Sequence, residues 1–122
     1  MMRLTSSELR RLGACENDIE KFKELWPKGL DLEAGACEVR WAWISSWMGL
    51  VPLDARVEFE RKRASAWEHY ERVRCAAMEI CLRAPMGSRV KASEDYEAID
   101  VAAWISLKRS LLIAIFPQLK NR

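Results

Sequence analysis

Apolar residues recur at helical spacing along most of this chain. Between Glu16 and Pro27, for example, one stripe holds Ile19, Phe22, Leu25 and Trp26, which is typical of an amphipathic helix that ends before a proline. The same reading of spacing and breakers predicts five helices, over residues 6–12, 16–26, 32–48, 53–84 and 94–115. Sustained strand alternation is absent from the sequence, so we expect no sheet.

Capping residues define the expected starts of these helices. Thr5 and Glu8 have the spacing of a capping box ahead of the first helix. Asp31 and Ser93 are good N-caps for the third and the fifth. The fourth segment has no helix breaker until Pro85, which predicts a helix unusually long for a chain of 122 residues.

The long helix over 53–84 carries a wide apolar arc. On a helical wheel one sector holds Phe59, Ala66, Tyr70, Val73, Ala77, Ile80 and Ala84, flanked by Trp67, Met78, Cys81 and Leu82. An arc this wide contacts two neighbouring helices at once. We therefore expect an all-α fold: a compact bundle of four to five helices around this one long helix, with Ile80 in its core.

Three of the six tryptophans lie within seven positions of the third predicted helix. Trp41 shares a stripe with Ile44, whereas Trp43 and Trp47 lie on a second stripe on nearly the opposite side. If other helices enclose this helix, both stripes belong to the core. If one stripe is exposed, Trp43 and Trp47, with Arg40 beside them, are candidate anchors for a partner, because exposed tryptophan and arginine are typical of interface hot spots.

Composition supports a single globular helical domain over residues 1–122. Hydrophobic residues make up 50% and charged residues 31%, with five glycines and four prolines, which disfavours disorder and an all-β chain. The longest apolar run, at 111–116, is too short to span a membrane. The N-terminus lacks the apolar segment of a signal peptide, so we expect a cytoplasmic protein.

Residues capable of catalysis or metal binding are sparse and scattered. The four cysteines, at 15, 37, 75 and 81, form no C-x-x-C pair, and we expect them to be reduced, buried side chains. His69 is the single histidine and has no nucleophile or acid at a catalytic spacing. The sequence therefore predicts no catalytic site, no metal site and no cofactor.

Nucleic-acid binding has little support in the charge pattern. The net charge is +2, and the densest basic patch, Arg61, Lys62 and Arg63, is interleaved with Glu58 and Glu60. Such mixing is typical of a solvated helix face.

Two segments together resemble a family of small helical proteins encoded by bacteriophages and prophages. Residues 9–27 carry an L-x-x-L-G-A-C element, and residues 64–77 carry a unit of the A-W-x-x-Y-x-x-V-R type. The resemblance implies a phage or mobile-element accessory protein in a bacterial host cell, and assigns no catalytic residue. By analogy, such proteins bind and block a host protein, including defence machinery of the CRISPR type.

Three hypotheses on function follow. The first is a non-enzymatic protein that binds a host or phage protein and inhibits a host defence complex, in the manner of an anti-CRISPR. The second is a nucleic-acid-associated helical module that uses either Arg61, Lys62 and Arg63 or the basic C-terminus. The third is a structural homodimer that hides the surplus tryptophan stripe against its own copy.

Overall fold

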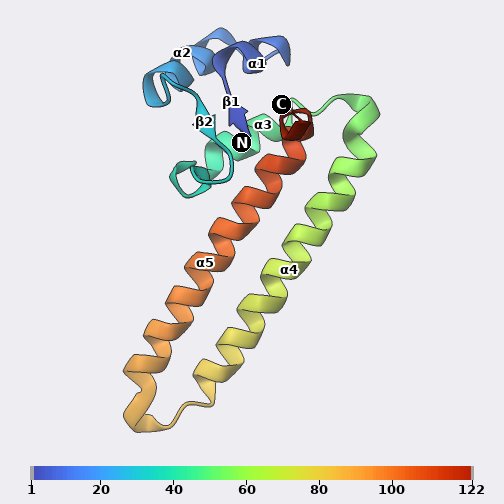
Figure 1. The fold of residues 1–122 in the computed structure, drawn as a ribbon. Coiled ribbons are helices and arrows are strands. Elements are labelled where there is room, and N and C mark those ends of the chain that lie inside the picture. The colour runs from blue at the N-terminus through green and yellow to red at the C-terminus, as the bar shows by residue number, and fades with distance from the viewer. Residues whose placement is uncertain (1, 122) are drawn as a thin grey trace.

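A computed structural model describes residues 2–121 of the chain (Figure 1). Its α-helices are α1 (Ser6–Arg11), α2 (Glu16–Leu25), α3 (Trp41–Met48), α4 (Arg56–Leu82) and α5 (Arg89–Ile115). Two short strands, β1 (Arg3–Leu4) and β2 (Leu30–Asp31), and four 3-10 helices complete the described part: η1 (Ala36–Glu38), η2 (Leu53–Ala55), η3 (Met86–Ser88) and η4 (Pro117–Asn121). The all-α prediction is confirmed.

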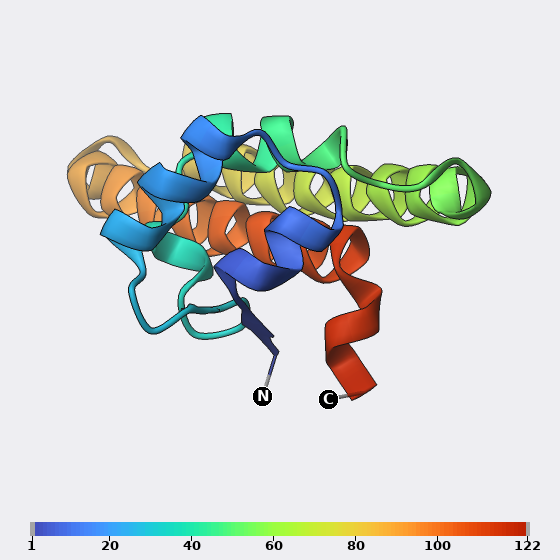
Figure 2. The same cartoon turned by 90° about the horizontal axis from the view of Figure 1, so that it is seen from above.

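Helices α4 and α5 form a long antiparallel hairpin. Each has 27 residues, which corresponds to a length of about 40 Å. Both views show the two helices side by side (Figures 1 and 2), and Figure 1 shows the smaller elements gathered at the end where the chain termini lie. We call these smaller elements and the adjoining ends of α4 and α5 the head, and the rest of the hairpin the arm.

The C-terminal half of α5 is the centre of the head. Its buried residues are Leu107, Lys108, Leu111, Leu112, Ala114 and Ile115. The largest side chains buried around it include Trp47 of α3, Phe22 of α2 and Phe116. The sequence predicted one long helix, over 53–84, whereas the structure has two of equal length. The centre of the head is α5, and the prediction that the helix over 53–84 is at the centre of the bundle is wrong.

The only strand pairing within residues 2–121 is very small. Arg3 pairs with Asp31 and Leu4 with Leu30 in antiparallel register. Leu4 and Leu30 are both buried, so the pair fastens the start of the chain to the core. The expectation of no sheet missed this pair because two residues are too few to show a period of two.

The third helix is much shorter than predicted. It begins at Trp41, because Asp31 caps a turn instead of a helix: its Oδ1 accepts hydrogen bonds from the backbone N–H groups of Glu33 (2.9 Å) and Ala34 (3.1 Å). The chain then turns at Gly35, where an added Cβ would lie 2.7 Å from the carbonyl oxygen of Asp31. Glycine is required by this close approach.

The boundaries and the core face of the hairpin also differ from the prediction. Helix α5 begins at Arg89, so Ser93 lies inside it and does not cap it. Ile80 was predicted to be in the core, yet its side chain is 71% exposed. The physical reason is that α4 packs chiefly against α5, so the part of its wide apolar arc that was expected to meet a second helix stays uncovered along the arm.

Candidate partner-binding site

The tryptophans of the head form two aromatic clusters, one on each side of α3. In the first, Trp47 lies among Phe22, Trp26, Trp43 and Phe116, with ring centroids 5.3 to 6.5 Å from its own. Edge and tilted contacts at such distances are favourable for aromatic rings. This cluster joins α2 and α3 to the C-terminal end of α5.

The second cluster lies where α3 meets the hairpin. Trp41 is 5.4 Å from Trp104 of α5 and 5.8 Å from Trp67 of α4. Tyr70 completes it, 5.8 Å from both Trp67 and Trp104. Both apolar stripes of α3 are thus packed, which is the first of the two alternatives that the sequence left open.

The three residues predicted to bind a partner have different fates in the structure. Trp47 is 1% exposed and cannot be an anchor, so its assignment to an exposed stripe is wrong. Its neighbours in the first cluster cover it, because the helix that carries it is enclosed on both sides. Trp43 is half-buried, and Arg40, the N-cap of α3, is exposed.

Arg40 and Trp43 line a groove between the end of α2 and the start of α3. The groove has a volume of about 410 Å³ and is lined by Leu25, Trp26, Glu38, Arg40 and Trp43. We call it the Trp43 groove. Its floor includes the edge contact of Trp26 on Trp43, at 5.9 Å and 69°, and Leu25 is 58% exposed at its side.

A second, shallower hollow adjoins the groove. It has about 280 Å³ and shares Arg40 and Trp43 with the groove, while Asp18, Lys21 and Ser46 line its other side. A partner segment lying over Trp43 would therefore find an apolar floor with charged groups on both flanks. Sequence reasoning found Arg40 and Trp43 but missed Leu25 and Trp26, which it assigned to the core stripe of the second helix.

The charged groups at the groove differ from most others on the surface. Within residues 2–121, Arg40 and Glu38 make no side-chain hydrogen bond or ion pair. Along α4, in contrast, Arg72 pairs with Glu68 at 2.8 Å and Arg83 with Glu79 at 2.6 Å. An arginine without an internal partner beside a half-exposed tryptophan has the composition of an interface hot spot.

The basic patch of the sequence does not form one surface of free positive charge. Arg61 donates two hydrogen bonds to Glu58, at 3.0 and 2.5 Å, and Arg63 pairs with Glu60 at 3.5 Å. These bonds from Arg61 lower the pKa of the Glu58 carboxyl, and the nearby charge of Lys62 adds to the effect. Because successive helix residues point in different directions, Lys62 instead lines a separate cavity.

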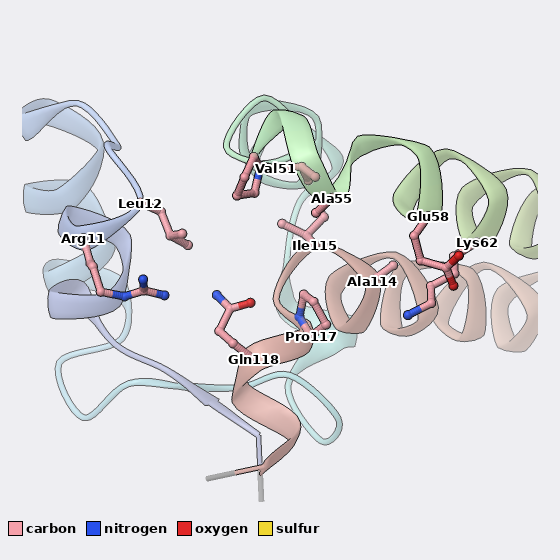
Figure 3. A pocket seen from close by; sticks show the side chains of 11 residues that line it. Arg11, Leu12, Val51, Ala55, Glu58, Lys62, Ala114, Ile115, Pro117 and Gln118 are labelled. Carbon is pink, nitrogen blue, oxygen red and sulfur yellow. The ribbon is translucent and has the colours of Figure 1, made fainter.

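That cavity lies within the head, between the end of α1, the start of α4 and the end of α5 with η4 (Figure 3). Arg11 and Leu12 face Pro117 and Gln118 across it, and its volume is about 230 Å³. Small-molecule sites usually measure about 300–1,000 Å³. Arg11 and Gln118 also both bind the buried carboxylate of Glu8, so this polar edge is occupied by internal contacts, and we do not assign a ligand to it.

Most of the cysteine side chains are exposed in the structure. Cys15, Cys37 and Cys75 are exposed and Cys81 is half-buried, so the prediction of four buried thiols is wrong. None of them pairs with another in a disulfide in the described part of the chain. Over residues 2–121 we find no group of three or more His, Cys, Asp and Glu side chains placed to hold a metal ion.

Comparison of the chain with known protein families, with curated proteins and with solved structures finds no match. Within the described residues, none of the helices combines the length and the apolar character needed to cross a bilayer.

Proposed function

We propose that this protein is a non-enzymatic binding protein whose Trp43 groove takes a segment of another protein. The observation that carries the proposal is the pairing of a half-exposed tryptophan, Trp43, with Arg40, a guanidinium that has no internal partner among the described residues. Desolvating an aromatic ring of this kind on binding is favourable. Around it, Trp26 and Leu25 extend the apolar floor to a size that suits a peptide segment.

The chemistry of the groove indicates what the partner segment carries. Its apolar side chains would cover Trp26 and Trp43, and a carboxylate beside them would pair with Arg40. Charge-assisted hydrogen bonds between a guanidinium and a carboxylate are directional and often bidentate. We therefore expect an apolar segment of the partner flanked by Asp or Glu.

A narrower proposal concerns the identity of the partner. We propose a phage or mobile-element accessory protein that inhibits a host defence complex, in the manner of an anti-CRISPR protein in the bacterial cytoplasm. The support for this step is the resemblance of residues 9–27 and 64–77 to phage-encoded helical proteins. This resemblance suggests a class of partner for the Trp43 groove, but it identifies no further residue of the binding site.

Capture and affinity measurements test the groove. Immobilised wild-type protein is expected to retain one stoichiometric protein from a bacterial lysate. The double substitution Arg40→Glu with Trp43→Ala should raise the Kd of the purified complex at least about thirtyfold, which corresponds to a hot-spot loss of about 2 kcal/mol. Arg72→Glu is the control, because Arg72 is an exposed arginine of α4 that does not line the Trp43 groove. Binding that survives the double substitution, or fails equally with Arg72→Glu, contradicts the proposal.

The narrower proposal has its own experiment. Expression of the protein in a bacterium with an active CRISPR system should restore plaques of a targeted phage, and Arg40→Glu should abolish the effect at equal protein level. Full immunity in the presence of the wild-type protein contradicts inhibition of that system but leaves the groove proposal to the binding measurement.

A further inference from the structure

The arm of the hairpin carries an apolar hollow that the head does not cover. It has about 200 Å³, and its apolar lining comes from both helices and the turn between them: Ala77, Ile80 and Cys81 of α4, Ala84 just after α4, and Ala92 and Ile99 of α5. We call this surface the arm face. Ile80 is 71% and Ile99 40% exposed on it, although both are large aliphatic residues that are usually buried.

The sequence pattern of the arm face is that of a helix with two neighbours. Ala66, Val73 and Ile80 follow one another at intervals of seven beside the row Tyr70, Ala77, Ala84. The second row includes Tyr70 and Ala77, which are buried against α5, whereas the first becomes more exposed toward the tip, from half-buried Ala66 to Ile80. The same interval of seven joins Ala92 to Ile99 on α5. Two adjacent rows of this kind are found in bundles of more than two helices.

The total surface of the chain is consistent with a missing neighbour. Its accessible area is 7954 Å², whereas a folded monomer of its mass, 14.1 kDa, is expected to expose about 6,700 Å². The excess is about 1,200 Å², and a protein–protein interface of standard size covers about 800 Å² on each partner. The excess over the whole chain is therefore larger than the area that one partner covers in such an interface.

We propose that a second copy of this chain packs on the arm face, so that two hairpins form a four-helix bundle with α4 of each copy against α5 of the other. A two-fold arrangement covers the exposed rows of α4 and α5 at the same time, because each copy contributes the same apolar surface to the contact. The alanines of the arm face let the second pair of helices approach closely. This association uses a surface separate from the Trp43 groove and does not depend on the proposed function.

The charges of the arm favour the same arrangement. Arg83, the C-cap of α4, and Asp95 of α5 both line the hollow. The arm part of α4 with its C-cap is neutral, since Arg72, Arg74 and Arg83 balance Glu68, Glu71 and Glu79. The arm part of α5 is acidic, with Glu94, Asp95, Glu97 and Asp100 against Arg89 and Lys91. Contact of α4 with α5 of the second copy therefore places the acidic α5 beside a neutral helix, which favours this pairing over α5 on α5.

The mass of the full-length protein in solution tests the proposal. Light scattering after size exclusion is expected to give twice the chain mass of 14.1 kDa. Ile80→Glu should give the single mass and raise the dissociation constant of the dimer at least about tenfold, because it puts a charge at the centre of the contact. Leu53→Glu is the control, since Leu53 is 90% exposed in η2 on the head. Far-UV circular dichroism should show equal helix content in all three proteins, because both residues are exposed in the single chain.

A charge-exchange pair checks which helices meet. Ile80→Lys and Ile99→Glu should each be monomeric alone and should dimerise when mixed, because one contact then becomes an ion pair and the other keeps two isoleucines. A wild-type protein of single mass throughout the micromolar range overturns the proposal, as does dissociation by Leu53→Glu equal to that by Ile80→Glu. A mixture that stays monomeric overturns the pairing of α4 with α5. A different protein bound stoichiometrically to the arm of a monomer, and released by Ile80→Glu, overturns the second copy as its occupant.

Discussion

The Nζ atom of Lys108 on α5 donates a hydrogen bond of 2.8 Å to the backbone carbonyl of Val39, two residues before α3 begins. A second, longer bond of 3.4 Å reaches the carbonyl of Cys37. Lys108 is only 7% exposed and Val39 is fully buried. The lysine therefore satisfies carbonyls that a continuous third helix would have used in its own hydrogen bonds, and it fixes the segment that leads into α3 and the Trp43 groove.

Replacement of Lys108 by Met should destabilise the fold by about 1–3 kcal/mol. The methionine keeps the apolar stem but leaves the buried carbonyl of Val39 and the part-buried carbonyl of Cys37 without this donor. Chemical denaturation measures the loss. The control is Lys91→Met, which breaks an exposed pair with Asp95 and should cost no more than about 0.5 kcal/mol. Equal losses from the two substitutions would mean that the Lys108 bonds do not stabilise the head.

Two substitutions at Trp47 should differ strongly in effect. Trp47→Ala removes the centre of the first aromatic cluster and should cost about 3–5 kcal/mol. Trp47→Phe should cost clearly less, because it keeps an aromatic ring and removes an indole Nε1 that is buried without a hydrogen-bond acceptor in the described residues. Thermal or urea unfolding of both variants gives the comparison. A phenylalanine variant as unstable as the alanine variant would show that this N–H group is satisfied in solution.

Tyr70 should make stability fall at alkaline pH. Its hydroxyl donates a hydrogen bond of 3.1 Å to Asp100 on α5, and burial, followed by this bond to the carboxylate, raises the pKa of the phenol. The contribution is complete below the unfolded pKa of about 10 and is lost as the pH rises through the raised folded value. Tyr70→Phe should cost about 1 kcal/mol at neutral pH. Unfolding curves at several pH values should then show a smaller alkaline decline for the variant than for the wild type.

Asp31 should contribute to the loss of stability in acid. The backbone N–H groups of Ala34 and Glu33 donate hydrogen bonds to its carboxylate and lower its pKa. The stabilisation is complete above the unfolded pKa of about 3.9 and disappears as the pH falls through the lower folded value. Asp31→Asn keeps an acceptor oxygen and removes the titration. Unfolding curves below about pH 4, near the ordinary pKa of an aspartate, should therefore show a smaller loss of stability for the variant than for the wild type. An equal loss would mean that the turn does not depend on the ionised carboxylate.

Thiol labelling should separate the cysteines. Cys15, Cys37 and Cys75 are exposed and should react with an aromatic disulfide reagent in the folded protein at rates near those of free thiols. Cys81 lies in the arm face and should react more slowly, and more slowly still if a second copy covers it. Its rate should then increase in Ile80→Glu, whereas the rate of Cys15 should not change.

Local signals in the sequence determined much of the secondary structure. Thr5 caps α1 through its side chain, which accepts a hydrogen bond from the N–H of Glu8, as the capping-box spacing predicts. Pro27 and Pro85 follow the ends of α2 and α4. The sequence by itself also showed that apolar residues cover most of the circumference of α3, but it left open whether both of its stripes are packed or one is exposed.

The tertiary structure decided which of two equally apolar positions is buried. Trp47 and Ile80 both lie in apolar stripes, yet Trp47 is 1% and Ile80 71% exposed. A helical wheel gives the direction of a side chain but not the presence of a neighbour, and α4 meets one long helix where its pattern suits two. The start of α3 was likewise decided by long-range contacts, since the bonds from Lys108 join residues about 70 positions apart in sequence, a separation that no local pattern encodes.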